Sequence, residues 1–401
     1  MFQQWNIVNL TTRNMSTQKY DLVVIGGGIL GTFHAYHALL MGKTVLQLEK
    51  DNYPVGATVR NFGQVVASGM SKEWFDYGVR SIQIYQQIQR EFDITVRKNG
   101  SVYIASDADE QILIHELSAH YSTRGYAHDM LSKASILKKY TSVKESYAKE
   151  AIFFDQEISV EPTLMIHRVH EYMRVKFPEF TQHYNASVID CATVGNEVFV
   201  KLTNGKTFTA DQAVLCNGYE FKLLFPDIFA ASGQVISKLQ MMRTVPLPIG
   251  GLEGNILTGL TIRRYESFEE YCPSFKSIIV PEHYAELKAN GIHILFKTAP
   301  DGSVIIGDSH EYADVNHFDD LGFKISAAIN KLMLMEAERI VNIPVRKIET
   351  AWAGYYPQHP TKNIIEHEVD ERIHIRTCIG GKGMTASAGY AEYSIDKIFR
   401  N

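Results

Sequence analysis

The segment from Tyr20 to Lys50 constrains the fold more than any other part of this 401-residue chain. The short apolar run from Leu22 to Ile25 is typical of a strand that is buried on both faces. It ends at Gly26-Gly27-Gly28-Ile29-Leu30-Gly31, which is a GxGxxG motif. In such a turn the first glycine allows a sharp bend, the second lets backbone N–H groups approach a pyrophosphate, and the third lets a helix pack closely on the strand. The motif therefore predicts a nucleotide site at the N-terminus of a helix.

The residues after the glycines complete a strand, turn, helix and strand unit. Residues 31–41 can form a helix, Gly42 and Lys43 break it, and residues 44–48 form a second strand with Glu49 at its end. A carboxylate about 20 residues after the glycines suits a hydrogen bond to a ribose 2′-hydroxyl and repels a 2′-phosphate. The unit therefore predicts an adenine dinucleotide site that disfavours NADP. To this site we assign Gly26, Gly28, Ile29, Gly31, Glu49 and Lys50.

The composition is that of an ordinary folded protein and excludes several classes of partner. Hydrophobic residues make up 45% of the chain, charged residues 21%, and the formal net charge is -5. Because there is no basic stripe, we expect no nucleic-acid binding. No apolar run reaches the ~18 residues that cross a bilayer and no signal-peptide pattern is present, so we expect a cytoplasmic protein with no transmembrane segment. The four cysteines are scattered and none has zinc-ligand spacing, so we expect no metal site.

The chain as a whole predicts an α/β protein (α+β overall) with two lobes. We expect residues 20–90, 150–220 and 340–401 to form a discontinuous Rossmann-like lobe for the dinucleotide, because residues 213–218 look like another buried parallel strand that ends in glycine. Residues 91–149 and 221–339 would form a substrate-binding lobe with an antiparallel sheet, and residues 1–19 a loose extension. In the substrate lobe we expect strands at 234–244, 255–263, 292–298 and 303–307 and a helix at 318–340.

Residues 52–64 form a loop that leaves the second strand of the dinucleotide unit. Such a loop passes close to the phosphates, and a surface loop rarely combines arginine, asparagine, phenylalanine and two glycines unless it holds something. We therefore assign Thr58, Arg60, Asn61, Phe62 and Gly63 to the cofactor site.

These residues resemble the FAD-dependent oxidoreductases of the D-amino-acid oxidase, glycine oxidase and sarcosine oxidase group. The resemblance covers nearly the whole chain after Tyr20 and is carried by residues 26–49, 57–63, 213–218 and 380–389. It implies FAD rather than NAD, because this family holds the flavin ring at a glycine-rich turn that opens the last helix. Backbone N–H groups and a lysine at that turn would stabilise the negative charge of a reduced flavin. The further cofactor residues that we expect are Val188, Gly218, Lys382, Gly383, Met384 and Thr385.

Residues 59–64, 307–312 and 383–385 resemble, more narrowly, a branch of this family implicated in the breakdown of aminophosphonates such as 2-aminoethylphosphonate derivatives. Related amino-acid oxidases carry a Trp-Ala-Gly-Leu-Arg-Pro block whose arginine clamps the substrate carboxylate. Here the block reads Trp352-Ala353-Gly354-Tyr355-Tyr356-Pro357, without the arginine. The departure favours a phosphonate over a simple α-amino acid.

The reaction that the resemblance implies is oxidation of the amine C–N bond of a small anionic substrate, by hydride transfer to flavin N5 and hydrolysis of the imine. Because side chains alternate along a strand, only one of Arg263 and Arg264 can face the cleft, and we favour Arg263. We expect catalytic roles for His310 and Tyr356, and substrate contacts from Gln64, Arg263, Lys297, Trp352 and Lys382.

Other functions stay open from the sequence. The same fold also suits an FAD-dependent oxidase or dehydrogenase of a D-amino acid, sarcosine, glycine or a 2-hydroxy acid. An NAD-dependent dehydrogenase and a non-catalytic flavoprotein are also compatible with these motifs. The electron acceptor, the attachment of FAD and the oligomeric state have no sequence signal.

Overall fold

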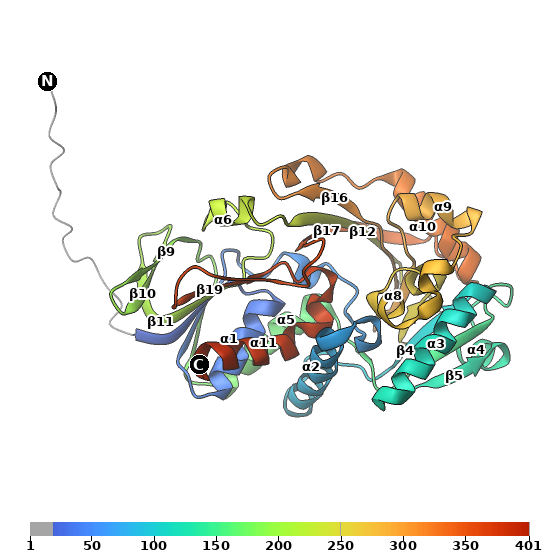
Figure 1. The fold of residues 1–401 in the computed structure, drawn as a ribbon, viewed down its shortest axis with the longest axis horizontal. Coiled ribbons are helices and arrows are strands. Elements are labelled where there is room, and N and C mark those ends of the chain that lie inside the picture. The colour runs from blue at the N-terminus through green and yellow to red at the C-terminus, as the bar shows by residue number, and fades with distance from the viewer. Residues whose placement is uncertain (1–18, 249, 401) are drawn as a thin grey trace, which may run out of the picture.

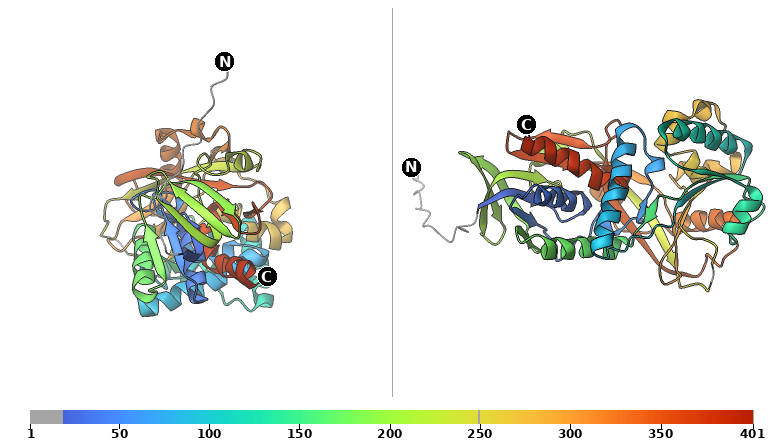
Figure 2. Two further views of the ribbon diagram at one scale, coloured as in Figure 1. Left: turned by 90° about the vertical axis from the view of Figure 1, so that its left-hand side faces the viewer. Right: turned by 90° about the horizontal axis from the view of Figure 1, so that it is seen from below.

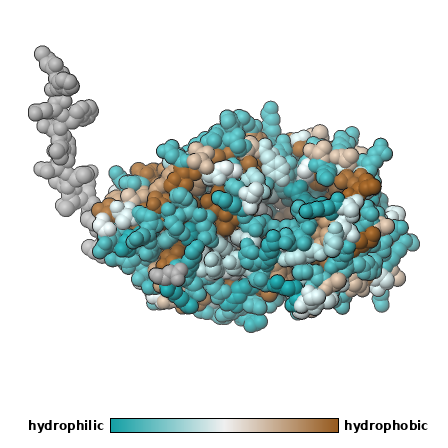
Figure 3. All heavy atoms as spheres, viewed as in Figure 1, coloured by the Kyte–Doolittle hydropathy of each residue, from teal (hydrophilic) through white to brown (hydrophobic). Residues whose placement is uncertain are grey.

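The computed structural model describes residues 19–248 and 250–400. Two large β-sheets with helices packed on them make up the described chain, so the expected mixed α/β class is confirmed (Figure 1). The expected extension, residues 1–19, lies outside the described residues except for Lys19, which begins β1. Hydrophilic residues cover most of the face seen in Figure 3, between smaller hydrophobic patches.

The first sheet has eight strands and contains the dinucleotide unit. Its central strand, β1 (Lys19–Ile25), pairs in parallel with β2 (Val45–Leu48) on one side and with β11 (Thr207–Leu215) on the other, as the apolar runs predicted. Residues 22 to 24 of β1 are fully buried, which explains why no polar residue interrupts this run. The strands are β1 (Lys19–Ile25), β2 (Val45–Leu48), β8 (Phe180–His183), β9 (Val188–Val194), β10 (Glu197–Leu202), β11 (Thr207–Leu215), β18 (Ile365–Glu368) and β19 (Ile373–Thr377).

The second sheet has nine strands and is mainly antiparallel. Its longest pairing joins two strands that are more than a hundred residues apart in the chain, β12 and β17. The strands are β4 (Ser101–Ala105), β5 (Asp129–Ser132), β6 (Glu150–Phe154), β12 (Val235–Thr244), β13 (Asn255–Leu257), β14 (Leu295–Thr298), β15 (Val304–Gly307), β16 (Glu311–Asp314) and β17 (Ile348–Gln358). The short strands β3 (Gln64–Val65) and β7 (Ile158–Ser159) pair with each other.

Helices from distant parts of the chain pack beside the first sheet. The last helix, α11, packs on both α1 and α2, and Figure 2 shows α11 beside α1 in the view from below. The helices are α1 (Ile29–Leu40), α2 (Lys72–Glu91), α3 (Ala108–Arg124), α4 (Lys133–Lys139), α5 (Pro162–Lys176), α6 (Pro226–Ala230), α7 (Gly259–Ile262), α8 (Glu266–Tyr271), α9 (Glu282–Ala289), α10 (Ala327–Ile340) and α11 (Gly383–Arg400). None of the helices described here is long and apolar enough to span a bilayer.

The expected strand at residues 255–263 is wrong in its second half. β13 ends at Leu257 and helix α7 begins at Gly259. The Thr258 hydroxyl donates a hydrogen bond to the Ile294 carbonyl at 2.6 Å, and the Gly259 N–H donates to the Tyr147 hydroxyl at 2.8 Å. These contacts bend the chain out of the sheet, and they come from distant residues that strand propensity does not include.

Two further expectations about individual elements need correction. The expected helix 318–340 is a 3₁₀ turn at Phe318–Leu321 followed by α10, whose first turn is capped by the Ser326 side chain. β6 and β17 both belong to the second sheet, where β6 pairs with β4 and β5 and β17 pairs with β12. The lobe boundaries that we expected instead place residues 150–154 and 348–358 with the first sheet. The division into two lobes therefore stands as a proposal with these two strands moved.

A buried carboxyl group, Glu157, links the second sheet to the segment after β3. One carboxyl oxygen accepts hydrogen bonds from the Ser68 N–H at 2.6 Å and the Tyr126 hydroxyl at 3.1 Å. The other oxygen is buried and has no hydrogen-bond partner among the residues that the structure describes. Burial raises the pKa of Glu157 from 4.5 to about 7.

This raised pKa predicts that stability falls with pH. Between pH 4.5 and about 7 the folded state binds more protons at Glu157 than the unfolded state does, so the stabilisation is complete below the unfolded pKa and is lost as pH rises through the folded one. Glu157→Gln cannot titrate, so its free energy of unfolding should gain on the wild type by roughly 3 kcal/mol between about pH 5 and about pH 8. Urea denaturation of both proteins at the two pH values measures this, and parallel profiles would contradict it.

Candidate active site

A cavity of about 550 Å³ extends from the glycine turn after β1 to the second sheet. Its lining comes from segments that are far apart in the sequence: the turn after β1, the loop 54–64, the end of β11, the β17 strand and the turn after β19. The carboxyl ends of the parallel strands therefore open into the same space, which is where open α/β sheets bind ligands.

Gly26, Gly28 and Gly31 have different structural roles. Gly26 has φ +117°, and a Cβ there would lie 2.2 Å from the Cys216 carbonyl oxygen. A Cβ on Gly31 would lie 2.2 Å from the Gly26 carbonyl oxygen, so the third glycine lets α1 pack on the first turn. Gly28 has an ordinary φ of -69°, and a Cβ there would meet only the Thr58 hydroxyl at 3.1 Å. Gly28 thus keeps open a part of the cavity at the N-terminus of α1, which fits the pyrophosphate of a dinucleotide.

Glu49 lines the cavity at the end of β2. Its carboxyl oxygens accept hydrogen bonds from the Gly27 N–H at 2.8 Å and the Asp51 N–H at 3.0 Å. Burial raises the pKa of Glu49, while these two N–H groups lower it. The bonds fix the carboxyl group and leave lone pairs for the hydroxyls of a ribose.

Fifteen of the seventeen expected cofactor residues line this cavity, and Arg60 and Gly63 do not, contrary to our expectation. The Arg60 guanidinium donates to the carbonyls of Val55 at 2.7 Å and Ala353 at 3.1 Å, so it ties the loop to β17. Gly63 has φ +71°, and a Cβ there would lie 2.2 Å from the Val160 carbonyl oxygen. The lining residues are Gly26, Gly28, Ile29, Gly31, Glu49, Lys50, Thr58, Asn61, Phe62, Val188, Gly218, Lys382, Gly383, Met384 and Thr385.

The turn after β19 lines the cavity from Gly380 to Thr385 and leads directly into α11. The Thr385 hydroxyl accepts a hydrogen bond from the Val66 N–H at 3.2 Å, which joins this turn to the segment after β3. The Lys382 ammonium lies 3.0 Å from a Glu266 carboxyl oxygen. A helix N-terminus with a lysine beside it fits a cofactor that becomes negatively charged when reduced.

The two expected catalytic residues, His310 and Tyr356, are in contact with each other. His310 Nε2 lies 2.7 Å from the Tyr356 hydroxyl, and Nδ1 lies 3.2 Å from the Gly291 carbonyl oxygen. Because a carbonyl only accepts, Nδ1 carries the proton, so Nε2 accepts the hydrogen of the tyrosine. A Cβ placed on Gly381 would lie 3.6 Å from the Tyr356 hydroxyl, so that hydroxyl faces the turn after β19.

Burial decides the charge of this pair. It lowers the pKa of His310 to about 3, although the nearby Asp308 carboxylate raises it, and it raises the pKa of Tyr356. Both side chains are therefore neutral at neutral pH. The lone pairs of the tyrosine oxygen are left for a hydrogen bond from a ligand.

Sequence reasoning missed Asp308 and His293, and it passed over Arg264 in favour of its neighbour. All three line the cavity beside His310. His293 Nε2 lies 2.7 Å from Asp308 Oδ1, and the Arg264 guanidinium donates to the Gly291 carbonyl at 3.4 Å and to the Tyr312 hydroxyl at 3.2 Å. Burial alone would raise the pKa of Asp308, but His293, His310 and Arg264 lower it to about 2. The motif Gly-Asp-Ser-His contained Asp308, but only the distant pairing of β14 with β15 brings His293 to it.

Three of these side chains also have the geometry of a metal-binding group, which we did not expect from the sequence. His293, Asp308 and His310 each offer a ligand atom, and these atoms lie within 4.8 Å of one another. Two imidazoles and a carboxylate suit several divalent metals. The neighbouring positive charge of Arg264 opposes a dication at this position.

Arg263 is not in the cavity, so our choice between the two arginines was wrong. It follows the short helix α7, and its guanidinium lies 2.8 Å from a Glu110 carboxyl oxygen and 2.7 Å from one of Asp107. Its side chain is 5% exposed and that of Glu110 is fully buried. The strand alternation by which we expected only one of the two arginines to face the cleft does not apply, because the chain is helical here.

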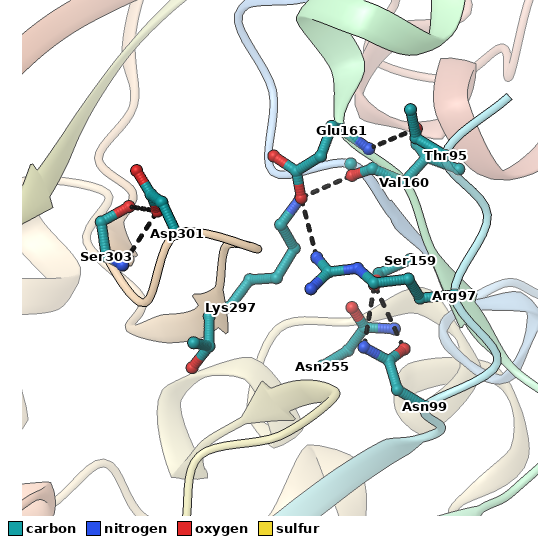
Figure 4. Close-up of polar contacts among 12 residues, drawn as sticks. Thr95, Arg97, Asn99, Ser159, Val160, Glu161, Asn255, Lys297, Asp301 and Ser303 are labelled. Atoms are coloured by element: carbon teal, nitrogen blue, oxygen red, sulfur yellow. Dashed lines mark hydrogen bonds and ion pairs between the residues drawn. The ribbon is translucent and has the colours of Figure 1, made fainter. Parts of the chain in front are cut away.

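Lys297 is also directed away from the cavity, contrary to our expectation. Its ammonium donates to the Val160 carbonyl at 2.5 Å and lies 3.1 Å from a Glu161 carboxyl oxygen (Figure 4). Arg97 pairs with the same carboxylate at 2.7 Å. Burial lowers the pKa of Lys297 to about 8, although Glu161 raises it. This buried network connects β14 to the start of α5, which is a structural role.

Three expected substrate contacts remain, of which Lys382 and Gln64 line the cavity and Trp352 does not. Gln64 lines the cavity, and its amide lies 3.5 Å from the Phe296 carbonyl oxygen. Trp352 does not line it, because its indole N–H donates to the Arg60 carbonyl at 3.3 Å. Trp352 therefore supports the loop 52–64 from outside.

Comparison with known proteins agrees with FAD as the cofactor. The family model described as FAD dependent oxidoreductase (DAO) matches residues 21–396. A glycine oxidase of Bacillus licheniformis is 21% identical over 405 residues, which cover 96% of this chain and 94% of that protein.

Solved structures agree on the fold. Glycine oxidase from Geobacillus kaustophilus superposes with a TM-score of 0.75 at 16% identity and covers 96% of both chains. The dithionite-reduced L-alpha-glycerophosphate oxidase from Mycoplasma pneumoniae, with FAD bound, has a TM-score of 0.75 at 14% identity and covers 95% of both chains.

Proposed function

We propose, since the chain belongs to the family of FAD dependent oxidoreductases, that this enzyme oxidises the amine C–N bond of a small anionic substrate and that this substrate is an aminophosphonate. 2-Aminoethylphosphonate and its N-methyl and 1-hydroxy derivatives are the compounds that we have in mind. Its FAD is expected to lie along the cavity from Glu49 to Thr385. An oxidase of a D-amino acid, glycine, sarcosine or a 2-hydroxy acid is the second candidate, and the curated glycine oxidase relative favours it.

The position of Arg264 in the cavity is the observation that supports an anionic substrate. It lines the cavity next to Tyr356, at the end away from the dinucleotide turn. No carboxylate of the described residues lies within ion-pair distance of it, although Asp308 is close enough to influence its pKa. Its two hydrogen bonds, to a carbonyl and a tyrosine, leave N–H donors of the guanidinium for a ligand. Charge-assisted bonds from such a group bind a phosphonate well.

The protein positions the reacting groups and manages charge. When FAD is bound, it supplies the acceptor for a hydride from the carbon that bears the amine. Arg264 holds the anionic end of the substrate, and the Tyr356 oxygen accepts a hydrogen bond from the substrate nitrogen while its own hydrogen is held by His310. The N-terminus of α11 and Lys382 stabilise negative charge next to the ring-binding turn.

The first experiment is a visible spectrum of the purified protein before and after anaerobic addition of candidate substrates. We expect a flavin band that 2-aminoethylphosphonate or one of its derivatives bleaches faster than glycine, sarcosine, a D-amino acid or a 2-hydroxy acid. Fastest bleaching by an amino acid or hydroxy acid would replace the phosphonate proposal by the second candidate. A protein that stays colourless after FAD is added back would contradict the cofactor.

Tyr356→Arg tests the missing carboxylate clamp. Tyr356 lines the cavity at the position where related oxidases carry an arginine in the aligned block, so the new guanidinium would offer a bidentate partner for a carboxylate. We expect the ratio of kcat/KM for glycine to that for the best phosphonate to rise by about tenfold or more. An unchanged ratio, in a variant that still holds FAD, would place the substrate's anionic group elsewhere.

A further inference from the structure

We infer that Thr32 and His170 are positioning residues for the pyrophosphate of FAD, because they fix the peptide between Gly27 and Gly28 so that its N–H points into the cavity. Neither Thr32 nor His170 lines the cavity, and both are fully buried behind the glycine turn. The inference rests on the placement of FAD in the proposed function, but not on the identity of the substrate.

The peptide between Gly27 and Gly28 needs outside support because only glycines surround it. Residues 26–28 are three consecutive glycines, whereas the motif requires glycine only at the first and third of these positions. Glycine has more accessible backbone conformations than any other residue, so this peptide can turn over at little cost. In one orientation its N–H faces the cavity, and in the other its carbonyl oxygen does. Since a carbonyl oxygen repels a phosphate, a side chain that selects the first orientation favours binding of the cofactor.

The Thr32 hydroxyl selects the first orientation. It donates a hydrogen bond to the Gly27 carbonyl at 3.1 Å, on the buried side of the turn. Because the C=O and N–H of a trans peptide point in opposite directions, the Gly28 N–H points away from Thr32. A hydrogen bond at the carbonyl also strengthens the N–H of the same peptide as a donor, by roughly 10–30%.

The Gly28 N–H is free, whereas its two neighbours are not. The Gly27 N–H donates to a Glu49 carboxyl oxygen at 2.8 Å, and the Ile29 N–H donates to the Thr58 hydroxyl at 2.9 Å. The Gly28 N–H donates to no atom of residues 19–248 and 250–400, and Gly28 lines the cavity. This N–H can therefore donate to a phosphate oxygen at the N-terminus of α1.

His170 determines the direction of the Thr32 hydroxyl. It lies on α5, which packs beside α1 (Figure 1). His170 Nε2 lies 2.7 Å from the Thr32 hydroxyl oxygen, and Nδ1 lies 2.9 Å from the Tyr184 hydroxyl. The Thr32 hydrogen is directed to the Gly27 carbonyl, which can only accept, so Nε2 donates to Thr32 and Nδ1 accepts from Tyr184. Burial lowers the pKa of His170 to about 3, so the ring is neutral and can both donate and accept.

Four variants test this chain of hydrogen bonds. Thr32→Val removes the hydroxyl at nearly constant volume, Thr32→Ser keeps it, and His170→Leu removes the donor behind it. Thr244→Val is the matched control, because the Thr244 hydroxyl is also buried and donates to a backbone carbonyl, that of Val245 at 2.8 Å, but lies outside the cavity. Full-length protein from which FAD has been removed is titrated with FAD, and its free energy of unfolding is measured in urea without FAD.

We expect Thr32→Val to raise the Kd for FAD by about tenfold or more, the usual effect of losing one hydrogen bond to a charged group. Thr32→Ser should bind FAD nearly as the wild type does, and His170→Leu should raise the Kd by about threefold. Thr244→Val should lose stability as Thr32→Val does, but should keep the wild-type Kd. At saturating FAD, the ³¹P resonances of the bound pyrophosphate should shift in Thr32→Val, while the visible flavin band stays in place.

Three results would overturn the inference. The first is a wild-type Kd for FAD in Thr32→Val. The second is a Thr32→Ser variant as weak as Thr32→Val, since the hydroxyl would then not be the group that matters. The third is an equal rise in Kd in Thr244→Val, which would trace the effect to a general loss of stability.

Gly28→Leu, measured beside these variants, separates this inference from the placement of FAD. If Gly28→Leu binds FAD normally, the placement of FAD in the proposed function fails, and the role of Thr32 fails with it. If Gly28→Leu loses FAD while Thr32→Val binds it as the wild type does, only the role of Thr32 and His170 fails.

Discussion

Replacement of Gly28 by leucine should produce a folded protein that is purified without FAD. Gly28 has an ordinary φ of -69°, so a side chain causes no backbone strain, and its Cβ would meet only the Thr58 hydroxyl at 3.1 Å. The rest of the leucine would extend into the cavity at the N-terminus of α1, where the pyrophosphate is expected. We expect FAD affinity to fall by roughly 100-fold or more, as measured by the flavin absorbance per protein and by titration with FAD.

The same substitution elsewhere separates loss of cofactor from loss of fold. Gly250→Leu is the control, since a Cβ at Gly250 meets no atom within 4 Å, and it should keep its FAD. Gly31→Ala should instead destabilise the protein, because its Cβ would lie 2.2 Å from the Gly26 carbonyl oxygen. Normal FAD content in Gly28→Leu would show that the pyrophosphate lies elsewhere.

The cofactor end of the site could be predicted from the sequence because its geometry is local. The turn expected to hold the pyrophosphate, the helix N-terminus and Glu49 lie within a single stretch of chain, and their expected roles follow from backbone geometry. Where this reasoning failed, at Arg60 and Gly63, the residues still lie next to the cavity, but their partners are in β17 and after β7. Residue type and loop position could not distinguish a side chain that contacts the cofactor from one that supports the loop.

The substrate end could not be predicted in the same way, because the pairing of distant strands determines which charged side chains face the cavity. Lys297 and Asp308 both belong to segments that sequence patterns marked correctly as strand or strand end. One is directed into a buried network with Glu161 and the other into the cavity, and this difference depends on which strands become neighbours. His293 had no local signal at all, since a lone histidine before a strand is most often a core residue.

Arg263 and Arg264 are adjacent in the sequence, but their different contacts predict different effects of substitution on stability and activity. Arg263→Gln would leave Glu110 buried without its partner, which typically costs about 3–5 kcal/mol, so we expect a large loss in the free energy of unfolding. Adding Glu110→Gln should restore part of that stability, because the fully buried unpaired charge would be gone and the other partner of Arg263, Asp107, is 32% exposed.

Arg264→Gln should leave stability and FAD content nearly unchanged, because the guanidinium faces a cavity and forms no ion pair with the described residues. Its kcat/KM for the best anionic amine should fall by roughly 100-fold, the expected loss of a charge-assisted bond to the substrate. Denaturation curves and steady-state kinetics on the two single variants measure both effects. Full activity in Arg264→Gln, together with lost activity in a folded Arg263→Gln variant, would contradict this assignment. The anionic group of the substrate would then bind on the other face of α7. Which of the two arginines faces the cavity depends on the helical bend after Leu257.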